Sequence, residues 1–154
     1  MTPAVLALQK AQADFKLHQY EHAPDAPSYG LEAAEKLGVN AHRVFKTLVA
    51  ETDKGELLVA IIPVDEKLNL KCLAKAAACK KADMAKPDKV QRSSGYVLGG
   101  VSPIGQKRPL VTFIHSSAQE LLSMYVSGGR RGLEIELAPD VLAKATGARF
   151  VNLL

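Results

Sequence analysis

A lysine in an otherwise apolar, strand-like run is the most informative single residue of this sequence. Lys46 lies in RVFKTLVAE, residues 43–51, where the alternation of side chains along a strand places it on the same face as Val44, Leu48 and Ala50. Such an ammonium either reaches water from the edge of the sheet or stays partly desolvated, which prepares it for an anionic ligand or for developing negative charge. Both interpretations stay open on the residues alone.

The stretch SGYVLGGVSPIGQKRP, residues 94–109, is a second candidate for a functional segment. It contains Gly95, Gly99, Gly100 and Gly105 among apolar residues and two prolines, and it has no acidic residue. A glycine has no Cβ, so another molecule can approach its main-chain N–H and C=O groups closely. The stretch therefore predicts a loop that presents its backbone to a ligand.

Other residue types that often carry chemistry lack the required spacing. His18 and His22 are four residues apart in a run that alternates like a strand, so they lie about 13 Å apart along it, too far to share one metal ion. Cys72 and Cys79 have no second pair and are interpreted as small, buried or half-buried thiols. We expect no metal and no cofactor. The phosphate-binding, dinucleotide-binding and nucleophile-elbow motifs are absent from the sequence, which removes support for those enzyme classes.

Two further groups of residues leave alternatives open. A dispersed serine–histidine–acid arrangement remains open because such groups meet in space and not in sequence. Its serine and histidine would come from Ser93, Ser94, Ser102 and His115. Tyr20 and Tyr29 flank a proline loop, where each ring either stacks on a base or sugar or packs into the core.

The hydrophobic pattern predicts the elements that must position these residues. Helices are expected at 3–14, 31–38, 69–81 with Asn69 as its cap, 87–93, 117–120 with Ser117 and Glu120 as a capping box, and 139–147. Strands are expected at 15–21, 43–51, 56–63, 110–115, 123–128, 133–138 and 148–154, and a loop at Pro24, Pro27 and Gly30. The two runs on either side of residues 53–55, and the two on either side of residues 128–132, read as hairpins. Short helices mixed with hairpin strands predict an α+β fold.

Length and composition set the broad class. The chain has 154 residues, of which 47% are hydrophobic and 23% charged, as expected for one globular domain over residues 1–154. No signal peptide and no apolar run long enough for a membrane span occur, so we expect a cytoplasmic protein that does not bind a membrane. The net charge is +4, but residues 67–92 alone carry eight basic and two acidic side chains. This segment is either a solvated lysine face or a binding surface for phosphates.

Several segments together resemble a known family, the YbaK-type Cys-tRNA deacylases, which belong to the superfamily of prolyl-tRNA synthetase editing domains. The segments are MTPAVLAL, HQYEHAP, EAAEKLG, FKTLVA, SSGYVLGGVSPIGQKR, YVSGGRRGLEIELAP and LAKATGA, and they run nearly from end to end. The resemblance implies an α+β fold with a mixed, largely antiparallel, barrel-like sheet surrounded by short helices.

The resemblance also implies a set of site residues. The essential lysine of the family matches Lys46, and its substrate-lining tyrosine matches Tyr20. A Gly-x-x-Pro element, whose backbone surrounds the aminoacyl ester, matches the run from Gly100 to Pro103. An acidic position that is often Asp in relatives is Glu134 here, and Phe-Gly of some relatives is Tyr29-Gly30. The full set of implied catalytic and substrate-binding residues is Lys46, Gly100, Tyr20, Tyr29, Gly99, Val101, Ser102, Pro103, Ser127, Gly128 and Glu134.

What the resemblance implies for function is a freestanding editing enzyme. Such an enzyme cleaves the ester of cysteine mischarged onto proline tRNA, and also takes Cys-tRNA(Cys), beside prolyl-tRNA synthetase as a partner. The family's chemistry is substrate-assisted, because the thiol of the cysteine attacks its own carbonyl group. Lys46 would lower the pKa of that thiol or hold the terminal phosphate or ester oxygen, and backbone N–H groups of the glycine loop would stabilise the oxyanion.

Two other functions remain open at this point. The first is a deacylase for another small residue, such as alanine on proline tRNA, which would use water or a tRNA hydroxyl. The second is a module that binds aminoacyl-tRNA or a synthetase without cleaving anything. Lys46 and the intact Gly-x-x-Pro element favour catalysis over binding alone, and a purely structural interaction domain explains neither feature.

Overall fold

The computed structural model describes residues 1–25 and 29–154. Its helices are α1 (Pro3–Lys10), α2 (Tyr29–Leu37), α3 (Leu70–Ala76), α4 (Pro87–Ser94) and α5 (Pro139–Thr146), with short 3₁₀ helices at Ala41–Arg43 and Ser116–Glu120. Its strands are β1 (Phe15–Gln19), β2 (Phe45–Thr52), β3 (Leu57–Pro63), β4 (Ala82–Met84), β5 (Val111–His115), β6 (Met124–Ser127), β7 (Leu133–Leu137) and β8 (Arg149–Val151). None of the helices in these residues is long and apolar enough to cross a membrane.

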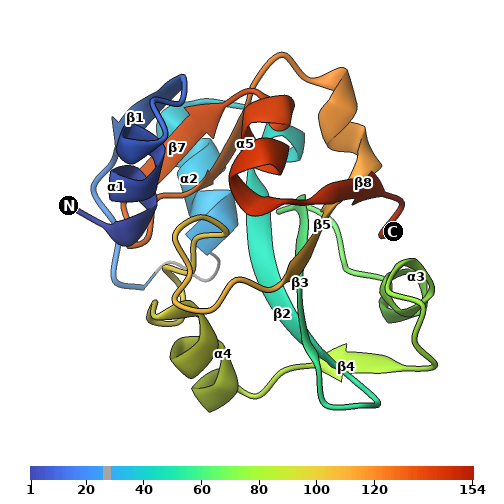
Figure 1. Ribbon diagram of the computed structural model, residues 1–154. Helices are drawn as coiled ribbons and strands as arrows, with labels where there is room; N and C mark the ends of the chain where they lie inside the picture. Colours follow the sequence, from blue (N-terminus) through green and yellow to red (C-terminus); the bar gives the residue numbers. More distant parts are fainter. Residues whose placement is uncertain (26–28) are drawn as a thin grey trace.

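The strands form two sheets (Figure 1). Antiparallel pairing gives one sheet the order β1-β7-β6. The other sheet has the order β4-β2-β3-β5-β8, where β2 is antiparallel to β3 and β4 while β5 is parallel to β3 and β8. A single bridge between Val44 and Tyr125 joins the start of β2 to β6. The expected α+β fold with mixed, largely antiparallel strands is confirmed, although the strands pair as two sheets and do not close into a barrel.

Local capping explains where helices begin. The Thr2 hydroxyl accepts a hydrogen bond from the N–H of Val5, with proline at the first position of α1. The Asn69 side chain accepts the N–H groups of Lys71 and Cys72, as expected for the cap of α3. Each such bond satisfies a backbone donor that has no partner inside the helix. Both predicted hairpins also form, β2 with β3 and β6 with β7.

Two expectations about helices are wrong. The helix expected at 69–81 ends at Ala76, because Ala78 adopts a left-handed conformation with φ of 56°, and the chain then forms the unexpected strand β4. Ser117 and Glu120 form no capping box: residues 116–120 are a 3₁₀ helix that follows His115 and has no side-chain capping hydrogen bond, and the buried Ser117 hydroxyl has no hydrogen-bond partner among the described residues.

The loop expected after β1 is shorter than its prolines and glycine suggest. Helix α2 begins at Tyr29, so Gly30 is helical, and its missing Cβ leaves room for Val64, whose Cγ1 would lie 2.3 Å from that Cβ. Pro27 lies outside the described residues. Strand β1 ends at Gln19, two residues before the expected end of the strand.

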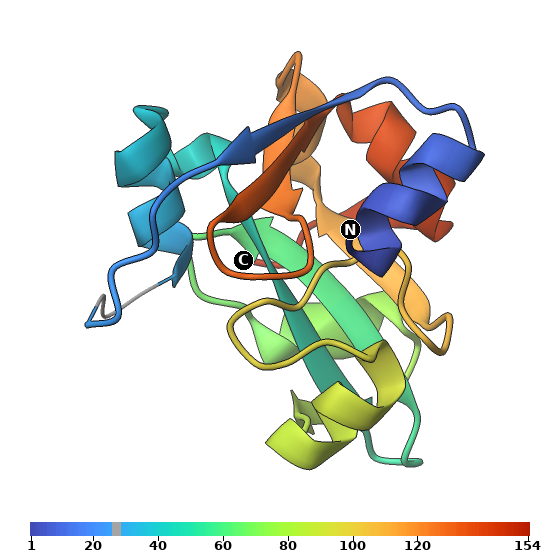
Figure 2. The same ribbon diagram turned by 90° about the vertical axis from the view of Figure 1, so that its left-hand side faces the viewer.

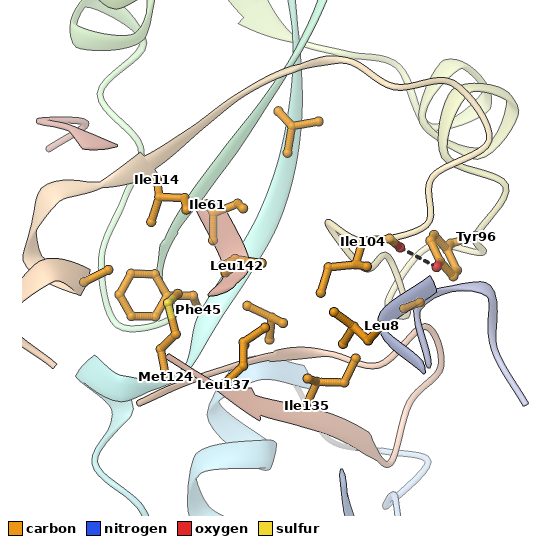
Figure 3. Packing of buried hydrophobic residues seen from close by; sticks show 14 of the residues in the cluster. Leu8, Phe45, Ile61, Tyr96, Ile104, Ile114, Met124, Ile135, Leu137 and Leu142 are labelled. Atoms are coloured by element: carbon orange, nitrogen blue, oxygen red, sulfur yellow. Dashed lines mark hydrogen bonds between the residues drawn. The ribbon is translucent and has the colours of Figure 1, made fainter. Parts of the chain in front are cut away.

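A buried cluster holds the two sheets, α1 and α5 together (Figure 3). Leu8 of α1 and Leu142 of α5 are almost fully buried in it. The glycine loop is attached to this cluster by Tyr96 and Ile104, both buried, and the Tyr96 hydroxyl donates to the Ile104 carbonyl oxygen at 2.6 Å. These anchors fix both ends of the segment 97–103, so its middle is held in place without regular secondary structure.

Candidate functional site

A pocket of about 430 Å³ lies where the two sheets meet. Six segments line it: the residue that follows β1, the start of α2, the first part of β2, the stretch from the end of β4 into α4, the glycine loop and the β6–β7 hairpin. In Figure 2 the tip of the β6–β7 hairpin and the glycine loop lie side by side in front of β2, with α2 on the left. Seven of the eleven residues expected from the sequence line this pocket, namely Tyr20, Tyr29, Lys46, Gly99, Val101, Ser127 and Glu134.

Strand β2 supplies one wall because it is only partly covered. Strand β4 pairs with β2 only from Ala50 to Thr52, which leaves the earlier part of β2 free to face the pocket. Lys46 there is half-buried, and burial lowers the pKa of its ammonium, while Asp65 and Glu66 act in the opposite direction. The buried hydroxyl of Thr47 has no hydrogen-bond partner among the described residues. Of the two interpretations of Lys46, this placement supports the partly desolvated cation.

Glu134 is the most strongly perturbed ionisable group of the pocket. It lies near the start of β7, opposite Ser127 of β6, and only 6% of its surface is exposed. Burial raises the pKa of its carboxyl group to about 8. Burial and the nearby Glu134 also raise the pKa of Tyr20, whose N–H donates to the Gly132 carbonyl oxygen at 3.0 Å. The pocket therefore contains a carboxyl group that keeps its proton at neutral pH.

The glycine loop uses its missing side chains to pack against the protein itself. A Cβ on Gly99 would lie 2.5 Å from Cε2 of Tyr29 and 2.8 Å from Nε of Arg131. A Cβ on Gly100 would lie 2.9 Å from Cα of Arg130. Both distances are shorter than real contacts of this kind, so the loop can approach α2 and the β6–β7 hairpin only as glycine. The close approach shapes the wall of the pocket.

Four of the expected residues do not line the pocket. Gly100 is buried, and its N–H donates to the Val97 carbonyl oxygen at 3.0 Å, so that N–H is already used within a turn. Ser102 is fully buried and its hydroxyl accepts the Ile104 N–H at 3.3 Å, while Pro103 beside it is also buried. The N–H of Gly128 donates to Leu133 at 2.8 Å and closes the hairpin. These residues shape the loops that carry the pocket walls.

The remaining sequence candidates do not join the pocket. Ser93 and Ser94 are buried, and both hydroxyls donate to the Val90 carbonyl oxygen within α4. His115 is buried, its Nδ1 accepts the N–H of Leu153 at 3.1 Å, and burial lowers its pKa. The serine–histidine alternative therefore loses its support. Cys72 and Cys79 are half-buried free thiols, as expected.

A hydrogen-bonded group that begins at the pocket wall was not expected from the sequence. Arg131 lines the pocket and stacks on Tyr29, His22 contacts Arg131, and the buried Glu32 contacts His22. His22 and Arg131 are 109 positions apart. Neither periodicity nor a motif relates residues so distant, so no signal in a single sequence could have found this group.

The basic segment 67–92 ends beside the pocket. Met84, Ala85 and Pro87 line the pocket, and the exposed Lys86 lies between the last two. Three of the cations in this segment form ion pairs, Lys81 with Asp83 at 3.8 Å, Lys89 with Glu51 at 2.8 Å and Arg92 with Asp88 at 3.0 Å. The others are exposed side chains, namely Lys67, Lys71, Lys75, Lys80 and Lys86. The exposed Lys86 therefore places positive charge beside the pocket.

Comparison with known proteins gives the family of this chain. Residues 23–145 match the aminoacyl-tRNA editing domain family. The chain is 36% identical over 152 residues to EbsC of Enterococcus faecalis, a protein proposed to be a Cys-tRNA(Pro)/Cys-tRNA(Cys) deacylase; the match covers 99% of this chain and 92% of EbsC.

Two more distant similarities are to proteins whose names concern prolyl-tRNA synthetase. It is 26% identical over 144 residues to the proline–tRNA ligase of Geobacter metallireducens, which covers 88% of this chain but 25% of the ligase. The fold superposes on a protein proposed to be a trans-editing enzyme for prolyl-tRNA synthetase with a TM-score of 0.84 and 22% identity, over 99% of this chain and 98% of the other. The chain belongs to the family of aminoacyl-tRNA editing domains.

Proposed function

We propose that this protein is a trans-editing deacylase that cleaves the ester of cysteine mischarged onto proline tRNA, and that it also accepts Cys-tRNA(Cys). The observation that carries the proposal is the meeting of Lys46, Glu134 and the glycine loop in one pocket at the end of a basic surface. The name of the relative EbsC supports cysteine as the amino acid. We place the reaction in the cytoplasm, where charged tRNA is made and used.

The proposed reaction uses the thiol of the substrate as its nucleophile. The Sγ thiolate attacks the carbonyl carbon of the same cysteine, the bond between that carbon and the ribose oxygen breaks, and a cyclic thioester leaves the tRNA. The Lys46 ammonium favours the thiolate, since a nearby cation lowers the pKa of a thiol. The ribose oxygen needs a proton as it leaves, and Glu134, protonated up to about pH 8, can donate one.

Backbone donors would stabilise the oxyanion that forms during the attack. The N–H of Gly100 is bonded to Val97, so we assign this role to its neighbours. Gly99 and Val101 line the pocket, and their N–H groups make no hydrogen bond to another described residue. Ser102 and Pro103 then hold the loop conformation, since both are buried behind the pocket wall.

Deacylation of three purified substrates tests this proposal. The wild-type protein, Lys46→Ala and the control Lys10→Ala are incubated with Cys-tRNA(Pro), Ala-tRNA(Pro) and Pro-tRNA(Pro). Lys10 is an exposed cation at the end of α1 and does not line the pocket. We expect wild type and Lys10→Ala to release cysteine alone, and Lys46→Ala to be inactive. Release of alanine would replace the thiol by water or a tRNA hydroxyl, and no release at all would leave a binding module.

Selectivity among tRNAs is expected to be weak in the isolated protein. Lysine contacts to phosphates give affinity without sequence information, and the chain matches only the part of a proline–tRNA ligase that amounts to 25% of its length. We therefore propose that prolyl-tRNA synthetase, as a partner, supplies the selection of proline tRNA. Turnover of Cys-tRNA(Pro) and Cys-tRNA(Cys) should be comparable without the synthetase, and a large preference for one of them would contradict this.

A further inference from the structure

Two contacts hold Arg131 in the pocket wall, one with the ring of Tyr29 and one with the imidazole of His22. Its guanidinium carbon lies 3.5 Å from the centre of the Tyr29 ring, so the two planar groups stack. Its Nη1 lies 3.0 Å from Nε2 of His22. A guanidinium has no acceptor atom, so Arg131 donates in this hydrogen bond and His22 accepts. The arginine is therefore fixed in position before any ligand arrives.

A buried carboxylate fixes the histidine in turn. Nδ1 of His22 lies 2.7 Å from Oε1 of Glu32, while Oε2 of Glu32 accepts the N–H of Ala23 at 2.8 Å. Because Nε2 already accepts from Arg131, the proton of the neutral imidazole must be on Nδ1, where it is donated to Glu32. The hydrogen bond from His22 lowers the pKa of Glu32, which keeps that carboxylate ionised. Glu32, His22 and Arg131 therefore form a hydrogen-bonded relay, which connects α2 to the β6–β7 hairpin.

The charge of Arg131 remains available to a ligand. Within residues 1–25 and 29–154, no carboxylate forms an ion pair with Arg131, whose guanidinium is hydrogen-bonded to His22 and stacked on the Tyr29 ring. The guanidinium has five N–H donors, and one hydrogen bond to His22 leaves the others free. Gly99 packs against both Tyr29 and Arg131 from the loop side, which leaves the pocket as the open direction. A preoriented, unpaired guanidinium beside a pocket suits a phosphate.

We propose that Arg131 binds the phosphate of the terminal nucleotide of the substrate RNA, and that His22 and Glu32 act as positioning residues for it. This inference rests on the proposed function. The aminoacyl ester is carried by the ribose of the last nucleotide, so the phosphate that joins this nucleotide to the one before it is the nearest anion to the ester. Arg131 then holds this phosphate while Lys46 remains available for the thiol of the substrate.

The relay makes this phosphate site sensitive to pH. Protonation of His22 places a proton on Nε2, which removes the acceptor for Arg131 and sets two positive charges against each other. The charged and titratable groups that face His22 are Glu32 and Tyr29 from α2 and Arg131 from the hairpin. Acidification should therefore release Arg131 from His22 and weaken phosphate binding, whereas neutral and alkaline pH should preserve it.

Binding of an uncharged analogue tests the phosphate site without any cleavage. The probe is the trinucleotide CCA, compared with the same trinucleotide whose last linkage is a methylphosphonate and carries no charge. We expect wild type to bind the charged form about 10- to 100-fold more tightly, as for a charge-assisted hydrogen bond, and Arg131→Gln to lose this difference. Arg108→Gln is the matched control: it removes an exposed arginine that does not line this pocket, and it should keep the difference.

The relay is tested by two histidine variants with different reach. His22→Gln can place an acceptor near the position of Nε2, whereas His22→Asn reaches only the position of Nδ1 and Glu32. We expect His22→Gln to bind the charged trinucleotide as wild type does at pH 8 but without weakening on acidification. His22→Asn should bind it like Arg131→Gln at every pH. Equal pH profiles for wild type and His22→Gln would overturn the role of His22.

The outcomes separate this inference from the proposed function. Equal binding of the two trinucleotides by wild type would overturn the phosphate site, even if Cys-tRNA(Pro) is still cleaved. Retention of the charge preference by Arg131→Gln would also overturn the assignment to Arg131. A charge preference that depends on Arg131 in a protein that cleaves none of the three aminoacyl-tRNAs would support the phosphate site and refute the deacylase.

Discussion

Lys46 and Glu134 line the same pocket. Burial lowers the pKa of Lys46 and raises that of Glu134, so it favours the neutral form of each group. Water that would stabilise the two charges is partly excluded there, so the same desolvation strengthens the interaction of either group with a bound substrate. Such groups cost stability in the free protein. At the scale of single residues, the pocket is therefore a place where stability and function oppose each other.

The clearest consequence concerns Glu134 and pH. Its pKa is about 8 in the folded protein against an ordinary value of 4.5, so between these pH values the native state keeps a proton that the unfolded chain has lost. Stability therefore falls as pH rises through this range, by about 5 kcal/mol at most. Glu134→Gln, which cannot ionise, should match wild type at pH 4 and have the larger free energy of unfolding at pH 8.5. Urea denaturation at both pH values measures this.

An exposed glutamate supplies the control for this prediction. Glu35 lies on the surface of α2, so Glu35→Gln should follow wild type at both pH values. Suppose that the stability difference between Glu134→Gln and wild type were the same at pH 8.5 as at pH 4. The carboxyl group would then ionise at little cost, and its role as a proton donor would have to be abandoned.

At the scale of elements, the hairpins and most helices could be predicted from the sequence because their signals are local. Two strand-like runs on either side of residues 53–55 indicated the β2–β3 hairpin, and Asn69 capped its helix as expected. The three-residue strand β4 was missed, because it pairs with residues of β2 that lie 30 to 34 positions earlier in the chain, from Thr52 with Ala82 to Ala50 with Met84. Short segments with distant partners have no signal of their own.

The site was predictable where it depended on residue type and unpredictable where it depended on contacts. Lys46 stood out as a cation among apolar neighbours, and the glycine loop stood out by composition. Two features depend on how the loop, α2 and the hairpin pack together. One is the turn in which Gly100 uses its N–H, and the other is the contact of Glu32 with Arg131 through His22. Sequence spacing contains no information on these contacts.

Alanine substitutions at two glycines with similar backbone conformations distinguish the cost of backbone strain from the cost of a steric clash in the loop. Gly99 has φ of 86° and Gly147 has φ of 69°, but a Cβ on Gly147 would meet no atom within 4 Å. Gly147→Ala should therefore cost only about 1 kcal/mol of stability. Gly99→Ala adds a clash with Tyr29 and Arg131, so we expect a further loss of about 1–3 kcal/mol and a fall of about 10- to 100-fold in deacylation.

Thermal and urea unfolding of both variants, together with the rate of cysteine release, measure these effects. Gly147→Ala should keep the wild-type rate, since Gly147 ends α5 and does not line the pocket. Equal stability and equal rates for the two variants would show that the loop yields easily and that its packing against Tyr29 has no part in catalysis.

At the scale of the whole molecule, basic side chains are concentrated in the segment 67–92, and part of this segment lies beside the pocket. The basic segment 67–92 contains α3, β4 and most of α4; in Figure 1 β4 and α4 lie at the lower end of the molecule and α3 at its right-hand side, and the β4–α4 connection lines the pocket. Helices α1 and α5 lie at the upper end in both views. An RNA whose end enters the pocket can therefore extend over the basic segment.

The salt dependence of tRNA binding tests this orientation. Each lysine that contacts a phosphate displaces a counterion, so the logarithm of the binding constant falls linearly with the logarithm of the salt concentration. Lys80 and Lys86 are exposed and form no ion pair within the described residues, so replacing both by Gln should reduce the slope by about 2 and weaken binding at low salt. Lys10→Gln with Lys144→Gln removes the same charge from α1 and α5 and should leave the slope unchanged. Equal slopes for the two double variants would mean that only net charge attracts the RNA and that the basic segment does not orient it.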